Sequence, residues 1–141
     1  CRSPRPPGQF VFAYDATQHW TMKKLLIVED ELLMAFFLHK KFQTSDYEIV
    51  DMVYDGESAI EAARRCHPDI ILMDIRLRGA WDGIETIAQI RQFADVPVLF
   101  VTGLLDPESA TRIDSTPKAS CLVKPVTIEQ LQAEMNSLLV A

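Results

Sequence analysis

Residues 24–31 read KLLIVEDE, an apolar run that ends in three consecutive carboxylates. Two further stretches have a similar design: residues 69–74 read DIILMD, and residues 97–103 read PVLFVTG. Short, nearly uninterrupted aliphatic runs are typical of central parallel strands, because helices cover both faces of such strands. These three stretches therefore predict the centre of a parallel sheet, with a polar side chain where each strand ends.

Helical segments with recognisable start signals separate these runs. Residues 82–85 (DGIE) and 127–130 (TIEQ) fit a capping box, in which the first and fourth side chains cap each other's backbone N–H groups. Asp106-Pro107 places a capping acid before a proline at the first helical position, and Asp55 opens the helix that runs to residue 65. The pattern predicts helices between the strands.

Two weaker strand patterns, at residues 48–53 and 120–123, complete an alternation of five strands with five helices. Strict alternation predicts βαβ crossovers, and hence an α/β fold with a parallel sheet and helices on both faces. The sequence contains neither G-x-G-x-x-G nor G-x-x-x-x-G-K-[ST], so it gives no support to nucleotide binding of the Rossmann or P-loop kind.

Length and composition limit the classes of protein that remain. The chain has 141 residues, of which 48% are hydrophobic and 24% charged, which is typical of one globular domain. A formal charge of −6 disfavours binding to a phosphate backbone, and no apolar run is long enough to span a membrane. Cys1, Cys66 and Cys121 are odd in number and scattered, so we expect idle thiols rather than a disulfide framework or a zinc site.

Composition changes near Met22. Residues 1–21 open with Pro4, Pro6, Pro7 and Gly8 and show neither a helix nor a strand period. We expect a disordered arm, either left over from cloning or belonging to an upstream start, because no apolar segment of a secretory signal follows its arginines. Residues 22–141 are expected to form the folded domain.

Reactive side chains follow four of the expected strands. Glu29 and Asp30 follow the first, Asp74 the third, Thr102 ends the fourth, and Lys124 follows the fifth. In an open α/β sheet these strand ends gather at one edge, where function resides. Crowded carboxylates need a compensating cation, and ligands made only of oxygen favour a hard ion such as Mg²⁺. A lysine and a hydroxyl beside them suit the oxygens of a phosphoryl group.

Each of these residues alone is more often a helix cap or a solvated surface group, but together, in this order, they make the sequence resemble a known family. The chain resembles the receiver domain of two-component response regulators. The matching stretches are LLIVEDE (25–31), DIILMDIRL (69–77), DGIE (82–85), PVLFVTG (97–103) and LVKP (122–125). The resemblance covers residues 22–141 and implies a flavodoxin-like, doubly wound (βα)5 fold with a parallel sheet of order 2-1-3-4-5.

The resemblance also implies roles for individual residues. Asp74 matches the phosphoacceptor, Asp30 the acid that binds Mg²⁺ directly, and Glu29 its neighbour that acts through water. The backbone carbonyl of Arg76 is expected to complete the protein's share of the metal shell. The resemblance implies that Asp74 accepts a phosphoryl group and that the protein is not an enzyme beyond its own Mg²⁺-dependent phosphorylation and dephosphorylation.

Two further residues match the family. Thr102 matches the switch hydroxyl that bonds the phosphoryl group, and Lys124 matches the lysine that pairs with the phosphoryl oxygens; its bond to Pro125 is expected to be cis. The implied partner is a histidine kinase or a histidine phosphotransfer protein, and the implied location is the cytoplasm. Neither nucleic acid nor a membrane is expected to bind this domain.

The sequence departs from the family pattern in several places. Cys121 stands where the family usually has Tyr or Phe, three residues before the lysine. The loop RLRGAWDG (76–83) has one residue more than the commonest form and lacks its proline. Arg76 and Leu104 occupy positions that vary in the family and tune dephosphorylation there. No effector domain follows the last expected helix within the chain, which ends at Ala141.

Two other functions fit the sequence less well. A phosphorylation-independent interaction module with the same fold would not need the five site residues, all of which are present. A phosphatase of the haloacid dehalogenase type would also use an aspartyl nucleophile, but it needs a second acid two positions later, and that position is Arg76.

The first helix carries apolar residues on both sides. At 100° per residue one stripe should face the sheet, formed by Met34, Phe37, Leu38 and Phe42. Leu33 and Phe36 point away from this stripe. The arm could cover these two side chains through Phe10, Phe12 and Trp20, or they could simply be isolated exposed residues. A third interpretation is a surface that docks the phosphodonor or a second copy in a homodimer.

Overall fold

The structure is a computed structural model and describes residues 22–140; the arm expected at residues 1–21 lies outside the described residues. None of the described helices is long and apolar enough to cross a membrane. Strands and helices alternate along the described chain in the order β1 (Lys23–Val28), α1 (Leu32–Phe42), β2 (Tyr47–Val53), α2 (Gly56–Cys66), β3 (Ile70–Met73), α3 (Gly83–Ile90), β4 (Val98–Thr102), α4 (Pro107–Asp114), β5 (Ala119–Val123) and α5 (Ile128–Val140).

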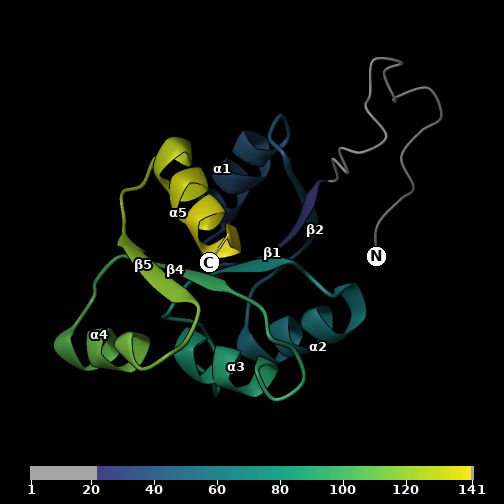
Figure 1. Cartoon of the computed structure of the whole chain (residues 1–141). Helices are drawn as coiled ribbons and strands as arrows, with labels where there is room; N and C mark the ends of the chain where they lie inside the picture. Colours follow the sequence, from purple (N-terminus) through teal and green to yellow (C-terminus); the bar gives the residue numbers. More distant parts are fainter. Residues whose placement is uncertain (1–21, 141) are drawn as a thin grey trace.

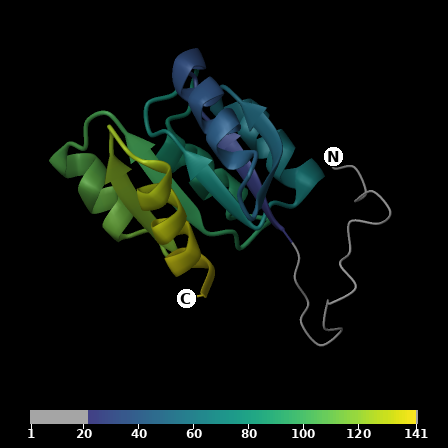
Figure 2. The same ribbon diagram turned by 90° about the horizontal axis from the view of Figure 1, so that it is seen from above.

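The five strands form one sheet in the order β2-β1-β3-β4-β5, and every neighbouring pair is parallel. Helices α1 and α5 cover one face of the sheet, and α2, α3 and α4 cover the other (Figures 1 and 2). The α/β class, the doubly wound flavodoxin-like architecture and the strand order are therefore confirmed. The two weaker strands, expected at residues 48–53 and 120–123, each begin one residue earlier than expected.

The aliphatic runs are continuous because their side chains supply two cores at once. Leu26 and Val28 of β1 pack into the layer under α2, α3 and α4, whereas Leu25 and Ile27 pack into the layer under α1 and α5. Successive side chains of a strand point to opposite faces, so a strand covered on both faces needs apolar residues at every position. The same residues that form the core thus fix where each strand ends.

The expected helix caps are present. Asp82 and Glu85 form a complete capping box at the start of α3, and Thr127 and Gln130 exchange the two equivalent hydrogen bonds before α5. Asp106 accepts a hydrogen bond from the backbone N–H of Ser109 at the start of α4. These caps satisfy backbone donors that would otherwise lack partners, and so they set where the helices begin.

Helix α1 has the two faces that the sequence predicted. Leu38 and Phe42 are buried against the sheet, while Leu33 is 82% and Phe36 64% exposed. Leu32, which the prediction left out, is 71% exposed beside them. We call Leu32, Leu33 and Phe36 the α1 outer row. Whether residues 1–21 cover this row lies outside the described residues.

The two cysteines in the described part of the chain differ in state. Cys121 on β5 is a free thiol, and burial raises the pKa of this thiol to about 11. Cys66, buried at the end of α2, is disulfide-bonded. The expectation of idle thiols throughout is therefore wrong for Cys66.

Candidate functional site

Three carboxylates meet at the carboxyl edge of the sheet. Glu29 and Asp30 directly follow β1, and Asp74 directly follows its neighbour β3. Backbone bonds hold these positions: the N–H of Asp74 donates to the carbonyl of Val28 at 3.0 Å, and the N–H of Glu29 donates to Val53 at 3.0 Å. One carboxylate oxygen from each of the three acids lies within 4.8 Å of the other two. The expectation that parallel strand ends bring these acids together is met.

Lys124 reaches into this cluster from the end of β5. Its Nζ lies 3.0 Å from Oε1 of Glu29 and 3.3 Å from Oδ2 of Asp74. The side chain is only 19% exposed, and the peptide bond to Pro125 is cis, as the sequence resemblance implied. One ammonium group therefore contacts two buried carboxylates that come from two different strands.

Burial sets the electrostatics of the cluster. It is the main reason that the pKa of Glu29 rises from 4.5 to about 7; Lys124 opposes the rise and the charge of Asp74 adds to it. Burial alone would lower the pKa of Lys124, but the hydrogen bond to Glu29 and the charges of Asp74 and Glu29 raise it above its ordinary value. The lysine is thus held as a cation, and its single charge faces three acids.

Thr102 and Arg76 stand beside the cluster in different ways. Thr102 is fully buried at the end of β4, and its backbone carbonyl accepts a 2.7 Å hydrogen bond from the N–H of Lys124. Its hydroxyl donates to the carbonyl of Leu104 at 3.2 Å. The N–H of Arg76 donates to Oδ1 of Asp74 at 3.2 Å. The backbone of Arg76 therefore holds one oxygen of Asp74, while Lys124 contacts the other.

Sequence reasoning missed the part played by Arg78. Its Nε lies 3.7 Å from Oδ2 of Asp30, although the arginine side chain is 85% exposed. The loop between β3 and α3 turns at Gly79, whose φ of 94° favours glycine, and Arg78 forms an isolated bridge with Asp55 before α2. The added loop residue was visible in the sequence, but only the path of the loop shows that Arg78 lies at Asp30.

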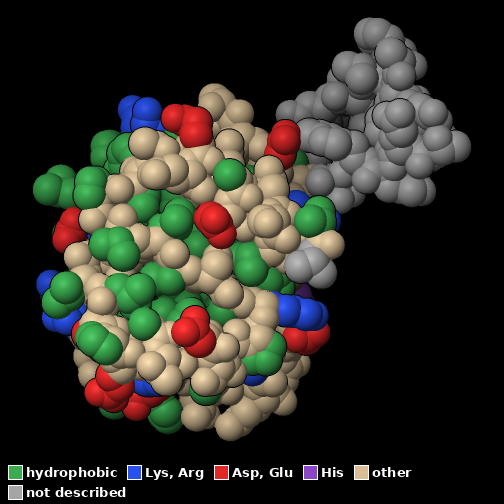
Figure 3. All heavy atoms as spheres, turned by 60° about the vertical axis from the view of Figure 1, so that its left-hand side comes forward, with side chains coloured by type: hydrophobic (Ala, Val, Ile, Leu, Met, Phe, Trp, Pro, Cys, Tyr) green, Lys and Arg blue, Asp and Glu red, His purple; other side chains and the backbone are tan. Residues whose placement is uncertain are grey.

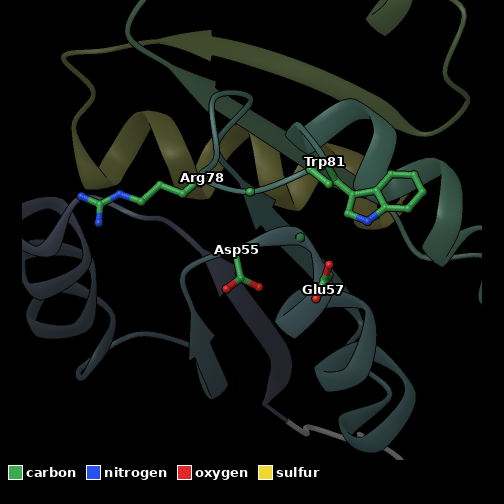
Figure 4. A pocket seen from close by; sticks show the side chains of 7 residues that line it. Asp55, Glu57, Arg78 and Trp81 are labelled. Atoms are coloured by element: carbon green, nitrogen blue, oxygen red, sulfur yellow. The ribbon is translucent and has the colours of Figure 1, made fainter.

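This loop also lines a small pocket beside the start of α2. Residues 78–81 form one wall and residues 55–57 the other, around a cavity of about 270 Å³. Figure 4 shows the side chains of Arg78 and Trp81 pointing in opposite directions along the loop, above Asp55. The cavity therefore lies between the loop and α2 and is separate from the cluster of three acids.

The donor set fits a magnesium ion. Glu29, Asp30 and Asp74 offer only carboxylate oxygens, which are the ligands that hard divalent cations prefer. Mg²⁺ usually takes one or two carboxylates directly and keeps several waters, and a site at the open edge of a sheet leaves room for them. A divalent charge would also offset the excess of acids over Lys124.

Comparisons with known proteins agree with this geometry. The response regulator receiver domain, as a family, matches residues 25–136. The chain is similar to the response regulator ArlR of Staphylococcus saprophyticus, with 34% identity over 118 residues that cover 84% of this chain and 53% of that protein. It is also similar to the transcriptional regulatory protein PdtaR of Mycobacterium tuberculosis, with 30% identity over 77% of this chain and 53% of that protein. The chain thus spans about half the length of these curated relatives.

Solved structures show the same fold. The signal receiver domain of a modulated diguanylate cyclase from Desulfovibrio desulfuricans superimposes with a TM-score of 0.77 at 32% identity, covering 84% of this chain and 94% of that one. The N-terminal domain of a response regulator/sensory box/GGDEF protein from Carboxydothermus hydrogenoformans gives 0.73 at 32% identity over the same shares. By fold, by the acids at the sheet edge and by sequence, this chain belongs to the response regulator receiver domain family.

Proposed function

We propose that the domain accepts a phosphoryl group on Asp74, in a reaction that needs Mg²⁺, from the phosphohistidine of a histidine kinase or a histidine phosphotransfer protein. The observation that carries this proposal is the contact of the Lys124 ammonium with both Glu29 and Asp74. A buried lysine placed between two acids is poised to stay beside Asp74 and pair with an incoming phosphoryl oxygen. The proposed setting is the cytoplasm, the location that the family implies.

Each residue of the site has a separate role in the phosphoryl transfer. A carboxylate oxygen of Asp74 forms the new bond to phosphorus while the bond between phosphorus and the donor imidazole nitrogen breaks, and that nitrogen keeps the electron pair. The N–H of Arg76 holds Oδ1 of Asp74, so the carboxylate cannot rotate freely. Lys124 stabilises negative charge on the transferred group. Asp30, Asp74 and the carbonyl of Arg76, with Glu29 acting through water, would hold Mg²⁺, which would neutralise the negative charge that develops on the phosphoryl oxygens.

The α1 outer row is the proposed docking surface for the phosphodonor. Leu32 begins α1 two residues after Asp30, so a protein that brings its imidazole to Asp74 approaches beside this row. Exposed apolar side chains gathered on one helix commonly mark a surface that a partner covers. A second copy of the chain in a homodimer is the competing occupant, and the sedimentation and transfer rate of a variant in this row distinguish the two.

Intact mass spectrometry with acetyl phosphate tests the proposed chemistry. In the presence of Mg²⁺ the wild-type chain should gain one phosphoryl group, and addition of EDTA should prevent the gain. Asp74→Asn should stay unlabelled. Asp95→Asn is the matched control, because Asp95 precedes β4 at the opposite end of the sheet and forms its ion pair with Lys118, away from the site.

The outcomes are distinct. Labelling that persists in Asp74→Asn, or that proceeds in EDTA, contradicts the assignment of the site. A wild-type chain that takes no label at all would favour a phosphorylation-independent interaction module with the same fold. A thermal melt of Asp74→Asn shows that a loss of labelling does not come from unfolding.

A further inference from the structure

Helix α4 is held on its α3 side by a bidentate ion pair. Nη1 of Arg112 lies 2.9 Å from Oδ2 of Asp82, and Nη2 lies 3.3 Å from Oδ1 of the same carboxylate. Both side chains are about one third exposed, and Asp82 is the residue that caps α3. Arginine forks of this kind fix direction as well as distance. The last turn of α4 is therefore tied to the first turn of α3.

On its other side, α4 faces a cavity. The space between α4 and β5 measures about 420 Å³, and Ile113 and Leu105 line it from one side, Ala119 and Cys121 from the other. Hydrophobic side chains gather on this face of the molecule (Figure 3). Cys121 is too small to fill the space, so β5 cannot push α4 through a side chain at this position.

The start of α3, in contrast, rests directly on the backbone that carries Asp74. The N–H of Gly83 donates to the carbonyl of Ile75 at 2.7 Å. A Cβ at Gly83 would lie 2.1 Å from the carbonyl oxygen of Asp74, so only glycine permits this approach. Because packed interiors are stiff, a displacement of the backbone at residues 74 and 75 has to move Asp82 as well.

The positive charge of Arg76, in the same loop, also acts on the residue that caps the other end of α4. Asp106 caps α4, and its pKa lies below the ordinary value chiefly because its carboxylate accepts the N–H of Ser109; the positive charge of Arg76 lowers it further. Arg76 also follows Asp74 by two residues. A phosphoryl group carries about −2 charge near neutral pH, so its arrival on Asp74 would attract the side chain of Arg76.

We propose that phosphorylation of Asp74 is transmitted to α4 through the loop between β3 and α3, with the Arg112–Asp82 ion pair as the link, and that Cys121 on β5 takes no part. The proposal rests on the proposed function of Asp74 as phosphoacceptor. The loop moves Asp82 at one end of the pair, and α4 follows because Arg112 grips both oxygens of that carboxylate.

Hydrogen–deuterium exchange of residues 107–114 tests this link. The wild-type chain is measured with Mg²⁺, with and without acetyl phosphate, beside Arg112→Gln, Arg112→Lys and Cys121→Ala. Arg64→Gln serves as the matched control, because Arg64 lies on α2 and contacts the ring of Phe93 instead of α4. Intact mass spectrometry of the same samples reports whether each variant carries the phosphoryl group.

Phosphorylation should change the exchange of α4 in the wild-type chain, and Arg112→Gln should remove at least half of that change. Arg112→Lys, which keeps the charge, should restore part of it. Cys121→Ala and Arg64→Gln should leave it intact. An Arg112→Gln variant that keeps the full change, a Cys121→Ala variant that loses it, or a wild-type α4 that does not respond would each overturn the proposal.

A measurement without acetyl phosphate separates this proposal from the proposed function. Loss of an exposed bidentate pair should speed exchange of residues 107–114 in Arg112→Gln by about threefold. Coupling is reciprocal, so the same variant should also speed exchange of residues 75–82. Unchanged exchange in that loop contradicts the link itself, whereas a wild-type chain that never gains a phosphoryl group contradicts the proposed function.

Discussion

The centre of the sheet and its β5 edge contribute to the same site but are built differently. Strands β3 and β4 are buried at every position, whereas every residue of β5 is at least partly exposed. The centre supplies Asp74 and Thr102, and the edge supplies Lys124 together with the cavity beside α4. A close-packed centre fixes the positions of the reacting groups, while a loosely covered edge can change shape when the site changes charge.

The largest effect on stability is expected from truncating a side chain at the centre of the sheet, and a matched truncation on β5 tests the difference between centre and edge. Ile71→Ala on β3, where the side chain is fully buried, should lower the free energy of unfolding by about 2–5 kcal/mol. Val123→Ala on β5, where the side chain is 48% exposed, should change it by no more than about 0.5 kcal/mol. Urea denaturation measures both. Similar losses for the two variants would mean that the edge is packed as tightly as the centre.

The next largest effect on stability is expected at Gly83, and Gly103 is its matched control. Gly83→Ala places a methyl group against the carbonyl of Asp74 and should cost about 1–3 kcal/mol. It should also slow labelling by acetyl phosphate, because Asp74 has to shift. A Cβ at Gly103 meets nothing within 4 Å, so Gly103→Ala should be neutral or slightly stabilising. A neutral Gly83→Ala would show that α3 does not rest on the Asp74 backbone as described.

The raised pKa of Glu29 predicts that the free energy of unfolding depends on pH. This pKa is about 7 in the folded chain against an ordinary 4.5, so the folded state binds the proton more tightly. Without a divalent ion, the contribution of Glu29 to stability should therefore be greatest below about pH 4.5. It should fall as the pH rises toward about 7. Urea midpoints at several pH values in EDTA measure the slope.

Glu29→Gln provides the control for that slope. The amide has no proton to lose, so the fall in stability between these pH values should flatten in the variant. Saturating Mg²⁺ should flatten it in the wild-type chain, because the ion binds the deprotonated carboxylate, and affinity for Mg²⁺ should rise over the same range. A variant with the wild-type slope would assign the titration to another group.

The smallest effect on stability is expected at the α1 outer row. Leu33→Glu combined with Phe36→Glu should change the free energy of unfolding by no more than about 0.5 kcal/mol, because both side chains are exposed. Labelling by acetyl phosphate should be unchanged, and transfer from a phosphorylated histidine phosphotransfer protein should slow. Val140→Glu on α5, where the side chain is 85% exposed, is the matched control.

Sedimentation of the same double variant distinguishes the occupants of the row. If wild-type dimers dissociate in the variant while the transfer rate stays the same, the row joins two copies instead of docking the donor. An unchanged transfer rate together with unchanged sedimentation would show that Leu33 and Phe36 are isolated exposed residues and not a docking surface.

The sequence alone was enough for the architecture and for the grouping of the acids. Continuous aliphatic runs can be satisfied only by strands covered on both faces, and a run that stops at Glu29 or Asp74 places that acid at the sheet edge. The caps at Asp82 and Asp106 could be predicted because they depend on residues three positions away. These inferences need only local spacing and the common direction of parallel strands.

Other features were decided by the tertiary structure, because they depend on the paths of loops and on distances between helices. No local spacing shows that Arg78 lies at Asp30, that Arg112 grips Asp82, or that a cavity remains between α4 and β5. Likewise, the pKa of Glu29 rises because the folded chain excludes water around it. A sequence determines which groups can meet at a strand end, but packing decides how closely they meet and how much water stays between them.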